Sequence, residues 1–258
     1  MRSTLNKLAT FFVCIPVVII ACGGVTIGAD KRQNISAAER ALAILEVQNT
    51  MSKHAYYYGA GKIIEEYEDI WVKEGGKYAD TASKGGIVGI AKIKEMFVGM
   101  KDENEKKALE EISKIYPEIK NVPENLGVGT DLVIHTQTTP IIEVAGDGQT
   151  AKGVWYSPGI GLTPYFKDGK VEVSGIFFWE KYGVDFVKED GIWKIWHMQM
   201  VYDFLPAIDS KWTDIDNPDA PTMGNSGWRP ETWTPKTIPE ISPRLPEPYY
   251  TFSETFSY

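Results

Sequence analysis

Residues 171–204 read VEVSGIFFWEKYGVDFVKEDGIWKIWHMQMVYDF. Both halves of this stretch are rich in Val, Ile, Phe, Trp and Tyr, the residue types that favour β-strands. Asp190-Gly191 lies between the halves, and an Asp-Gly pair flanked by apolar runs is a strong signal for a tight hairpin turn. The stretch therefore predicts two long antiparallel strands, 171–188 and 192–204.

The same pattern continues towards the N-terminus. Strand-forming residues fill 131–144 and 151–157, and two more Asp-Gly pairs, at 147–148 and 168–169, separate the apolar runs. Each pair predicts another tight turn. This half of the chain is therefore expected to form a run of antiparallel strands.

Before these strands, the spacing of apolar residues is typical of a helix. Ser36, followed three residues later by Glu39, has the form of a helix capping box. Apolar side chains and a histidine then recur at spacings of three and four, as on one face of a helix. These positions are Ile44, Val47, Met51, His54 and Tyr58. Gly59 and Gly61 interrupt the pattern, which resumes as a second helix to about Val72.

Two further helices are expected over 90–97 and 104–116. Helices followed by a run of antiparallel strands indicate an α+β fold rather than a doubly wound parallel sheet. The main domain is expected to span 36–204.

The first residues have the features of an export signal. Arg2 and Lys7 precede an uncharged run that ends at Ala21. This run is shorter than the about 20 residues of a membrane-spanning helix, so a signal peptide is expected instead. The letters IIAC, which end at Cys22, resemble a bacterial lipobox.

We therefore expect a lipoprotein signal peptide over 1–21, a lipid on Cys22 and a short tether over 22–35. The lipid would hold the protein to a membrane of the bacterial cell envelope, on the extracytoplasmic side. Two alternatives remain, which are an ordinary secretory signal cut near Ala29 and an uncleaved anchor.

Composition excludes several classes of function. The 258 residues carry a net charge of −8, and a nucleic-acid partner is not expected because phosphate binding needs clustered Lys and Arg. Two cysteines cannot form a disulfide scaffold or a four-cysteine zinc site, and three scattered histidines make a weak ligand set. No glycine-rich stretch has the strand–loop–helix setting of a nucleotide loop. We expect neither a metal ion nor another cofactor.

The last part of the chain, 205–258, holds nine of the fifteen prolines. It also holds eight aromatic residues, namely Trp212, Trp228, Trp233, Tyr249, Tyr250, Phe252, Phe256 and Tyr258. Disordered tails are usually poor in aromatic residues. This extension is therefore expected to wrap over the domain or over a partner subunit.

Three stretches carry a resemblance to a known family. They are EVQNTMSKHAYYY (46–58), DGQTAKGVW (147–155) and DGIWKIWH (190–197). Their order along the helix, the sheet and the last strand resembles the SnoaL-like branch of the nuclear transport factor two-like fold, over about 36–204.

The resemblance implies a cone-shaped α+β barrel, in which the N-terminal helices pack in a curved antiparallel sheet around a deep apolar pocket. It also implies cofactor-free dehydratases, isomerases, cyclases or lyases that act on hydrophobic, often aromatic, molecules. Many members use an Asp of the first helix, but the corresponding position here is Gly59. A mechanism that depends on that Asp is not expected for this chain.

General acid–base chemistry has few candidate groups. The three histidines, His54, His135 and His197, all lie in predicted helices or strands, and imidazole titrates near neutral pH. Each can also be a structural histidine with satisfied hydrogen bonds. Tyr58 is the inward member of the run at 56–58, and its phenol could hold an oxygen of a substrate.

Alternation along 176–186 separates two carboxylates. Glu180 lies in an otherwise apolar stripe with Tyr182, whereas Asp185 lies on the opposite face with Trp179. A single β-bulge would exchange the two faces, so both carboxylates remain alternatives. The remaining expected ring-binding residues are Trp71 and Trp155.

The sequence therefore predicts a membrane-tethered, cofactor-independent lyase, dehydratase or isomerase for a small hydrophobic, aromatic compound. His135 or His197 would transfer the proton, while His54 and Tyr58 would position an oxygen. The first alternative is a non-catalytic lipoprotein that binds a hydrophobic ligand or a partner protein. The second is a structural envelope protein whose tail is exchanged across a dimer, and a homodimer or higher homo-oligomer is expected in general.

Overall fold

The computed structural model describes residues 32–80, 85–118, 120, 132–208, 238 and 240–258. The chain divides into two units, 1–32 and 33–258, and the fold below is that of the second unit. The expected signal peptide, the lipidation site Cys22 and most of the tether lie outside the described residues.

The first two helices confirm the sequence prediction. Helix α1 spans Ala37–Gly59, and its capping box is formed, because Glu39 N donates to Ser36 Oγ at 3.2 Å and Ser36 N donates to Glu39 Oε2 at 2.8 Å. Helix α2 spans Ile63–Asp69. Gly61 adopts φ 66° between them, a left-handed conformation that glycine allows at little cost.

The prediction of two separate helices over 90–97 and 104–116 is wrong. One helix, α3, spans Ile90–Ile115. Two ion pairs four residues apart, Lys101 with Glu105 and Lys107 with Glu103, stabilise the stretch where a break was expected. Among the described residues, no helix is both long and apolar enough to cross a membrane.

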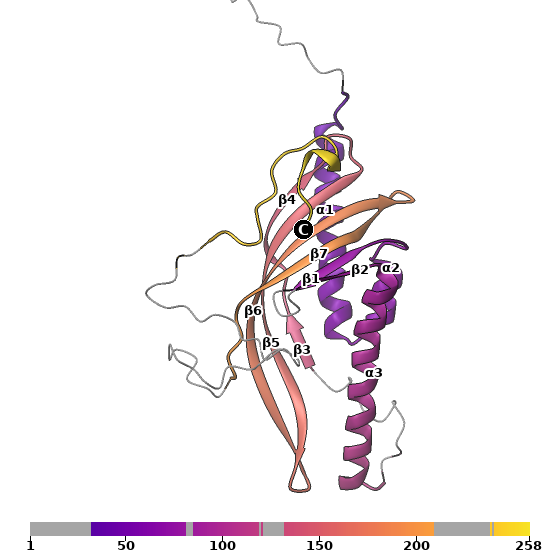
Figure 1. Ribbon diagram of the computed structural model, residues 1–258, viewed down its shortest axis with the longest axis vertical. Helices are drawn as coiled ribbons and strands as arrows, with labels where there is room; N and C mark the ends of the chain where they lie inside the picture. Colours follow the sequence, from indigo (N-terminus) through magenta and orange to yellow (C-terminus); the bar gives the residue numbers. More distant parts are fainter. Residues whose placement is uncertain (1–31, 81–84, 119, 121–131, 209–237, 239) are drawn as a thin grey trace, which may run out of the picture. The chain divides into compact units, whose positions relative to one another are not determined.

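The described strands form a single sheet with the order β2-β1-β7-β6-β5-β3, in which β4 also pairs with β5 (Figure 1). All pairs are antiparallel except β1 with β7. The strands are β1 (Lys77–Asp80), β2 (Gly85–Val88), β3 (Leu132–His135), β4 (Thr138–Val144), β5 (Thr150–Lys167), β6 (Lys170–Glu189) and β7 (Ile192–Phe204).

The predicted hairpin of β6 and β7 is confirmed. Asp190 and Gly191 adopt φ 53° and 79°, the left-handed pair of a type I′ turn. The predicted strand 131–144 is two strands, both paired with β5, and β5 continues ten residues past its expected end, to Lys167. The strands β1 and β2 were not predicted, because four-residue strands carry too short a period to detect.

The sheet has an inner and an outer face. On the inner face, Val184, Phe186 and Ile195 are fully buried and pack with Val47 and Met51 of α1. The helices therefore cover the inner face, and the α+β prediction with a curved antiparallel sheet holds. The outer face carries the alternate residues of the same strands.

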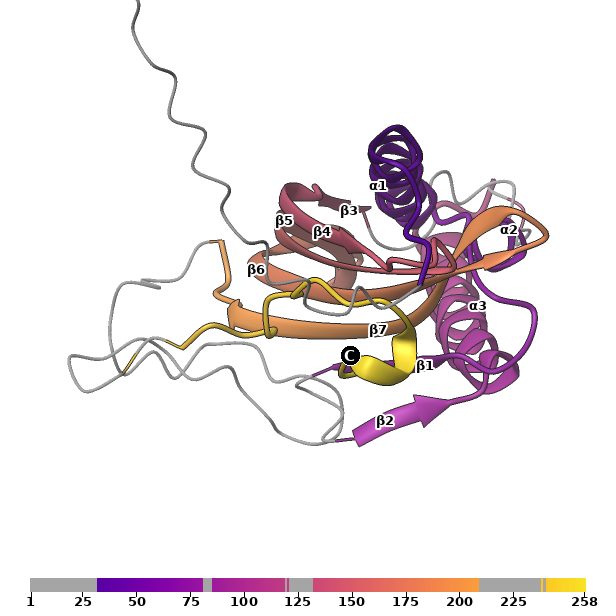
Figure 2. The same ribbon diagram turned by 90° about the horizontal axis from the view of Figure 1, so that it is seen from above.

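The C-terminal segment, defined here as 240–258, lies against the outer face. Gly146 N and Asp147 N donate to the carbonyl oxygens of Tyr249 and Tyr250, at 2.9 and 3.1 Å. Figure 2 shows the end of this segment (yellow) beside β7 and β1. The segment contains one short 3₁₀ turn, at Phe252–Glu254.

Candidate active site

A cavity of about 60 Å³ lies between the helices and the inner face of β6 and β7. Most of its lining is apolar or aromatic, and its polar groups are two histidines, two glutamates and several tyrosines. The lining residues are His54, Tyr58, Ile63, Glu66, Tyr67, Trp71, Tyr78, Phe97, His135, Glu180, Tyr182, Met198, Met200 and Tyr202.

His54 is held by a buried carboxylate. The glycine break turns α2 back along α1, so that Glu66 Oε1 lies 2.8 Å from His54 Nδ1. Trp71 Nε1 donates to the same Oε1 at 3.1 Å, so this oxygen accepts from the chain just after α2 as well as facing His54. When His54 Nδ1 donates to this carboxylate, the neutral imidazole presents its lone pair at Nε2. Nε2 is buried and has no hydrogen-bond partner among the described residues.

His135 ends β3 and reaches the same cavity. Its Nδ1 lies 3.2 Å from Ser157 Oγ and 3.9 Å from Glu180 Oε2. Its Nε2 is also buried without a partner in the described part of the chain. Burial, with a smaller contribution from His54, lowers the pKa of His135 to about 3. His135 is therefore neutral at physiological pH.

The two imidazoles lie close together among phenol rings. The ring centroids of His54 and His135 are 5.3 Å apart, and Tyr58 lies 5.8 and 5.4 Å from them. Tyr182 is 5.6 Å from His54, and its hydroxyl donates to Glu180 Oε2 at 3.1 Å. Burial and the nearby Glu180 raise the pKa of Tyr182, so its phenol stays protonated.

The structure thus brings together six of the residues proposed from sequence. They are His54, Tyr58, Trp71, His135, Glu180 and Tyr182. Glu180 and Tyr182 reach the cavity because even-numbered residues of β6 point inward, as the alternation predicted.

Four proposed residues lie elsewhere, which corrects the expectation of one shared site. His197 and Asp185 lie on the outer face, with Nδ1 2.8 Å from Oδ2. Asp185 alternates with the inward residues of β6, whereas His197 faces outward because a register shift between β6 and β7 follows Ile195, which faces inward. Trp179 is 39% exposed on that face. Trp155 is buried at the inner face but packs against Phe186 rather than the cavity.

Glu66 was missed by the sequence reading. It is 2% exposed although its neighbours Glu65 and Glu68 are surface residues. The available signal was its position between Ile63 and Ile70, at helical spacings of three and four within an apolar stripe. A charge in such a stripe needs a buried partner. The described residues contain no group of three or more His, Cys, Asp or Glu that could hold a metal ion.

The lowered pKa of His135 predicts a pH dependence of stability. Between pH about 6.5 and pH about 3, the unfolded chain binds a proton at this site that the folded protein does not. Acidification through this window therefore destabilises the fold, and His135 has no such effect above it. Between about pH 7 and pH 5 the loss is expected to be about 2 kcal/mol.

Urea unfolding of the wild type and of His135→Gln at both pH values measures this loss. The variant should lack that part of the pH dependence, whatever its stability at neutral pH. Equal slopes in the two proteins would show that His135 takes up its proton in the folded state.

The sequence profile of a SnoaL-like domain matches residues 39–199. No curated protein matches the chain.

Among solved structures, one similar chain is a candidate scytalone dehydratase from Novosphingobium aromaticivorans. It has 14% identity and a TM-score of 0.45, and the match covers 68% of this chain and 94% of that one. Another is the hexachlorocyclohexane dehydrochlorinase LinA-type3 from Novosphingobium barchaimii, with 12% identity, a TM-score of 0.44 and coverage of 68% and 96%.

Proposed function

Because the chain belongs to the SnoaL-like domain family, we propose that it is a cofactor-independent lyase, dehydratase or isomerase. The proposed substrate is a small hydrophobic compound with a ring and a carbonyl group. The reaction takes place by general acid–base chemistry in the cavity between His54 and His135.

One observation carries this proposal. Within the part of the chain that the structure describes, the Nε2 atoms of His54 and His135 are both buried without a partner, on rings 5.3 Å apart that line the same cavity. Leaving a buried polar group unsatisfied costs about 1–3 kcal/mol. A catalytic role is one recognised reason for such a group in a native protein, and a bound ligand can supply the missing hydrogen bond. Two of them in one cavity favour a substrate with two adjacent polar or acidic positions.

His54 is the proposed base. Its Nε2 accepts a proton from the carbon next to the carbonyl group, and Glu66 stabilises the imidazolium that forms. Glu66 touches His54 rather than the substrate and is therefore a positioning residue.

His135 is the proposed hydrogen-bond donor to the carbonyl oxygen. Gln137 Nε2 donates to Ser157 Oγ at 3.5 Å, which leaves the Ser157 hydroxyl hydrogen for His135 Nδ1. His135 then carries its proton on Nε2, and its low pKa keeps it neutral. A donor placed at the oxygen stabilises the enolate that forms when the carbon loses its proton.

The enolate can react further in two ways. In an elimination, it expels a hydroxide from the next carbon, and the His54 imidazolium returns its proton to that leaving group as water departs. In an isomerisation, the imidazolium returns the proton to a different carbon. Both outcomes conserve protons and electrons within His54 and the substrate.

The cavity sets a limit on the substrate. A cavity that holds benzene is about 150 Å³, whereas this one is about 60 Å³. Binding of a ring therefore requires side chains at the cavity wall to move, and Tyr58 and Phe97 are only partly buried. The apolar lining from Tyr67, Met198 and Met200 would contact the body of the ring.

Deuterium exchange tests the proposed chemistry before the natural substrate is known. A panel of cyclic ketones, with and without a β-hydroxyl group, is incubated with the protein in D₂O and followed by mass spectrometry. Protein-dependent exchange at the carbon next to the carbonyl, or loss of water, supports the proposal. Ligands that raise the melting temperature but never exchange would favour the non-catalytic binding protein instead.

The proposed location is the bacterial cell envelope, through a lipid on Cys22. The support is the sequence IIAC after an uncharged run. Replacement Cys22→Ala is expected to move the protein from the membrane fraction to the soluble fraction and to abolish labelling by a radioactive fatty acid, because the thiol is the attachment point. Cys14→Ala is the matched control, and membrane association of Cys22→Ala would contradict lipidation.

A further inference from the structure

A row of four charged or titratable side chains crosses the outer face of the sheet. Lys152 of β5, Asp185 of β6, His197 of β7 and Lys77 of β1 are direct neighbours in the strand register. Lys152 Nζ lies 2.5 Å from Asp185 Oδ1, and neither side chain has any exposed surface. Buried charges on this face need a cover that supplies further hydrogen bonds.

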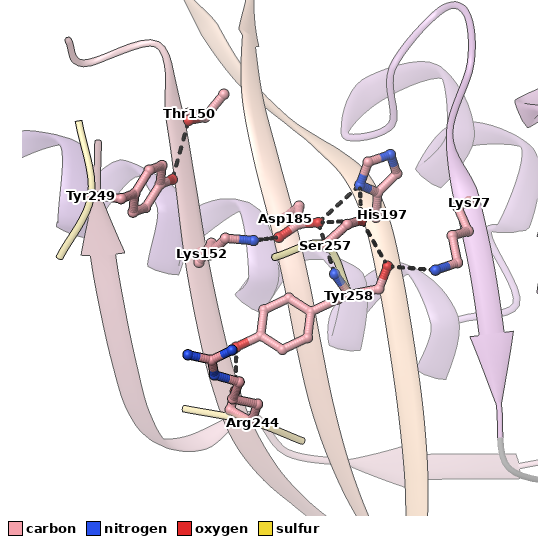
Figure 3. A network of polar contacts seen from close by, with 9 residues as sticks. All are labelled: Lys77, Thr150, Lys152, Asp185, His197, Arg244, Tyr249, Ser257 and Tyr258. Carbon is pink, nitrogen blue, oxygen red and sulfur yellow. Dashed lines mark hydrogen bonds and ion pairs between the residues drawn. The ribbon is translucent and has the colours of Figure 1, made fainter. Parts of the chain in front are cut away.

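The end of the C-terminal segment is that cover (Figure 3). Tyr258 N and Ser257 Oγ donate to Asp185 Oδ2, each at 3.1 Å. Lys77 Nζ donates to the Tyr258 carbonyl oxygen at 2.9 Å, and Ser257 Oγ lies 2.9 Å from His197 Nδ1. Two consecutive residues thus contact three strands of the sheet.

Aromatic rings of the same segment surround the Lys152 ammonium. Its Nζ lies 4.6, 4.4 and 5.1 Å from the ring centroids of Phe252, Phe256 and Tyr258, and 6.0 Å from that of Tyr249. These distances are in the range of cation–π attraction. The cation and its carboxylate therefore recognise both the rings and the backbone of the segment.

The shape of the sheet also matches the segment. A Cβ atom added to Gly183 would lie 2.6 Å from Tyr258 Cε1 and 2.9 Å from Pro243 Cβ. Only a residue without a side chain lets these groups rest directly on β6 at this point. We name the set Lys77, Lys152, Gly183, Asp185 and His197 the outer-face site.

The contacts of Ser257, His197 and Asp185 do not form a nucleophilic triad. In a triad the serine and the aspartate contact opposite nitrogens of the imidazole. Here both contact Nδ1, at 2.9 and 2.8 Å. The geometry is that of a docking site for a peptide.

The peptide is joined to the sheet by a long connection. After β7 the chain still contacts β6 at Ile208, whose N–H donates to Gly175 O at 2.8 Å, and the C-terminal segment begins at Glu240. Thirty-one residues, 209–239, separate the two, and a chain of that length spans at most roughly 100 Å. Such a connection permits docking on the same chain or on another one.

We propose that the outer-face site is a recognition site for an aromatic-Ser-aromatic peptide and that its second occupant is the C-terminal segment of another copy of this chain. An identical copy carries the same rings, hydroxyl and backbone groups, so every contact described above can be reproduced between copies. Reciprocal exchange of the two segments yields a dimer. This inference concerns the face opposite the cavity and is independent of the proposed function.

The covalent link between the sheet and the C-terminal segment determines when segments exchange between copies. Because the segment belongs to the same chain as the sheet, its effective concentration at its own site is about millimolar. Dilute copies therefore keep the segment on their own sheet, and exchange requires either a high local concentration of copies or a segment weakened by mutation.

Two full-length variants separate the site from its ligand. The double variant Phe256→Ala/Tyr258→Ala weakens the segment and leaves the site intact, whereas Gly183→Val blocks the site and leaves the segment intact. A labelled synthetic peptide of residues 249–258 serves as the probe. Fluorescence anisotropy should show at least about tenfold tighter binding to the double variant than to the wild type, whose site is occupied, and no binding to Gly183→Val.

Mixing the two variants tests the second copy directly. Light scattering after size exclusion should show monomers for each variant alone and a heterodimer for the mixture, because one variant supplies the site and the other the segment. A peptide that binds none of the three proteins, or binds all of them equally, would overturn the proposal. If the mixture stays monomeric although the peptide binds, the claim that a second copy supplies the bound segment would be wrong. The peptide measurement on the double variant stands even if Gly183→Val fails to fold.

Discussion

Replacement of His54 by Gln is expected to lower the rate of deuterium exchange, and of any turnover found with it, by about 10²–10⁴-fold. Two histidines line the cavity in the part of the chain that the structure describes. Of these, His54 is the one whose Nδ1 lies within hydrogen-bond distance of a carboxylate, which leaves its Nε2 to act as the base. A glutamine amide fills similar space but cannot accept a proton. The rate is measured by mass spectrometry on the substrate that exchanges with the wild type.

The controls distinguish chemistry from folding. Glu66→Gln keeps His54 in place but removes the charge that stabilises its imidazolium, so its loss should be smaller and should shift the pH profile of the rate. His197→Gln changes a histidine of the outer face and should leave the rate unchanged, once both variants are shown to be folded. A rate for His54→Gln within threefold of the wild type would remove His54 as the base.

Replacement of Asp185 by Ala is expected to destabilise the fold by about 3–5 kcal/mol. The side chain of Lys152 has no exposed surface, and without Asp185 its ammonium would be buried beside aromatic rings and would lose the carboxylate with which it forms an ion pair. Burial already lowers the pKa of Lys152, opposed by Asp185, so removal of the carboxylate leaves only the unfavourable contribution. Ser257 and Tyr258 lose their acceptor as well.

Urea unfolding measures this free energy. The double variant Lys152→Met/Asp185→Leu removes both charges and should recover most of the stability, because an apolar pair can replace a buried ion pair. The matched surface control is Lys73→Met. It removes the exposed ion pair with Asp190, whose partners are 72% and 81% exposed, and should change the stability far less than Asp185→Ala because water already solvates both charges. A loss for Asp185→Ala as small as that of the control would show that water or another group reaches Lys152.

The candidate site divides into a part that local sequence could predict and a part that it could not. His54 was placed inward because its spacing from Met51 and Tyr58 is helical, and α1 confirms that face. Alternation placed Glu180 and Asp185 on opposite faces of one strand and left both as alternatives, and in β6 the face of Glu180 is the inner one. Both inferences need only the period of one element.

Convergence of side chains from different elements could not be predicted in this way. His135 and His197 have the same local pattern, each on a strand beside apolar residues. Only the pairing of β3 with β5 and of β7 with β6 decides that His135 reaches the cavity while His197 faces outward. Each pairing joins residues far apart in the chain, so no local period contains it.

The sequence by itself determined the helix boundaries at Ser36 and Gly59, the hairpin turn at 190–191 and the order of helices before strands, because caps, turns and periods act within a few residues. Tertiary structure alone decided that Glu66 pairs with His54 and that residues 257–258 cover Asp185. Burial creates the need for these partners, since a buried charge requires a neighbour that only the folded chain brings within hydrogen-bond distance.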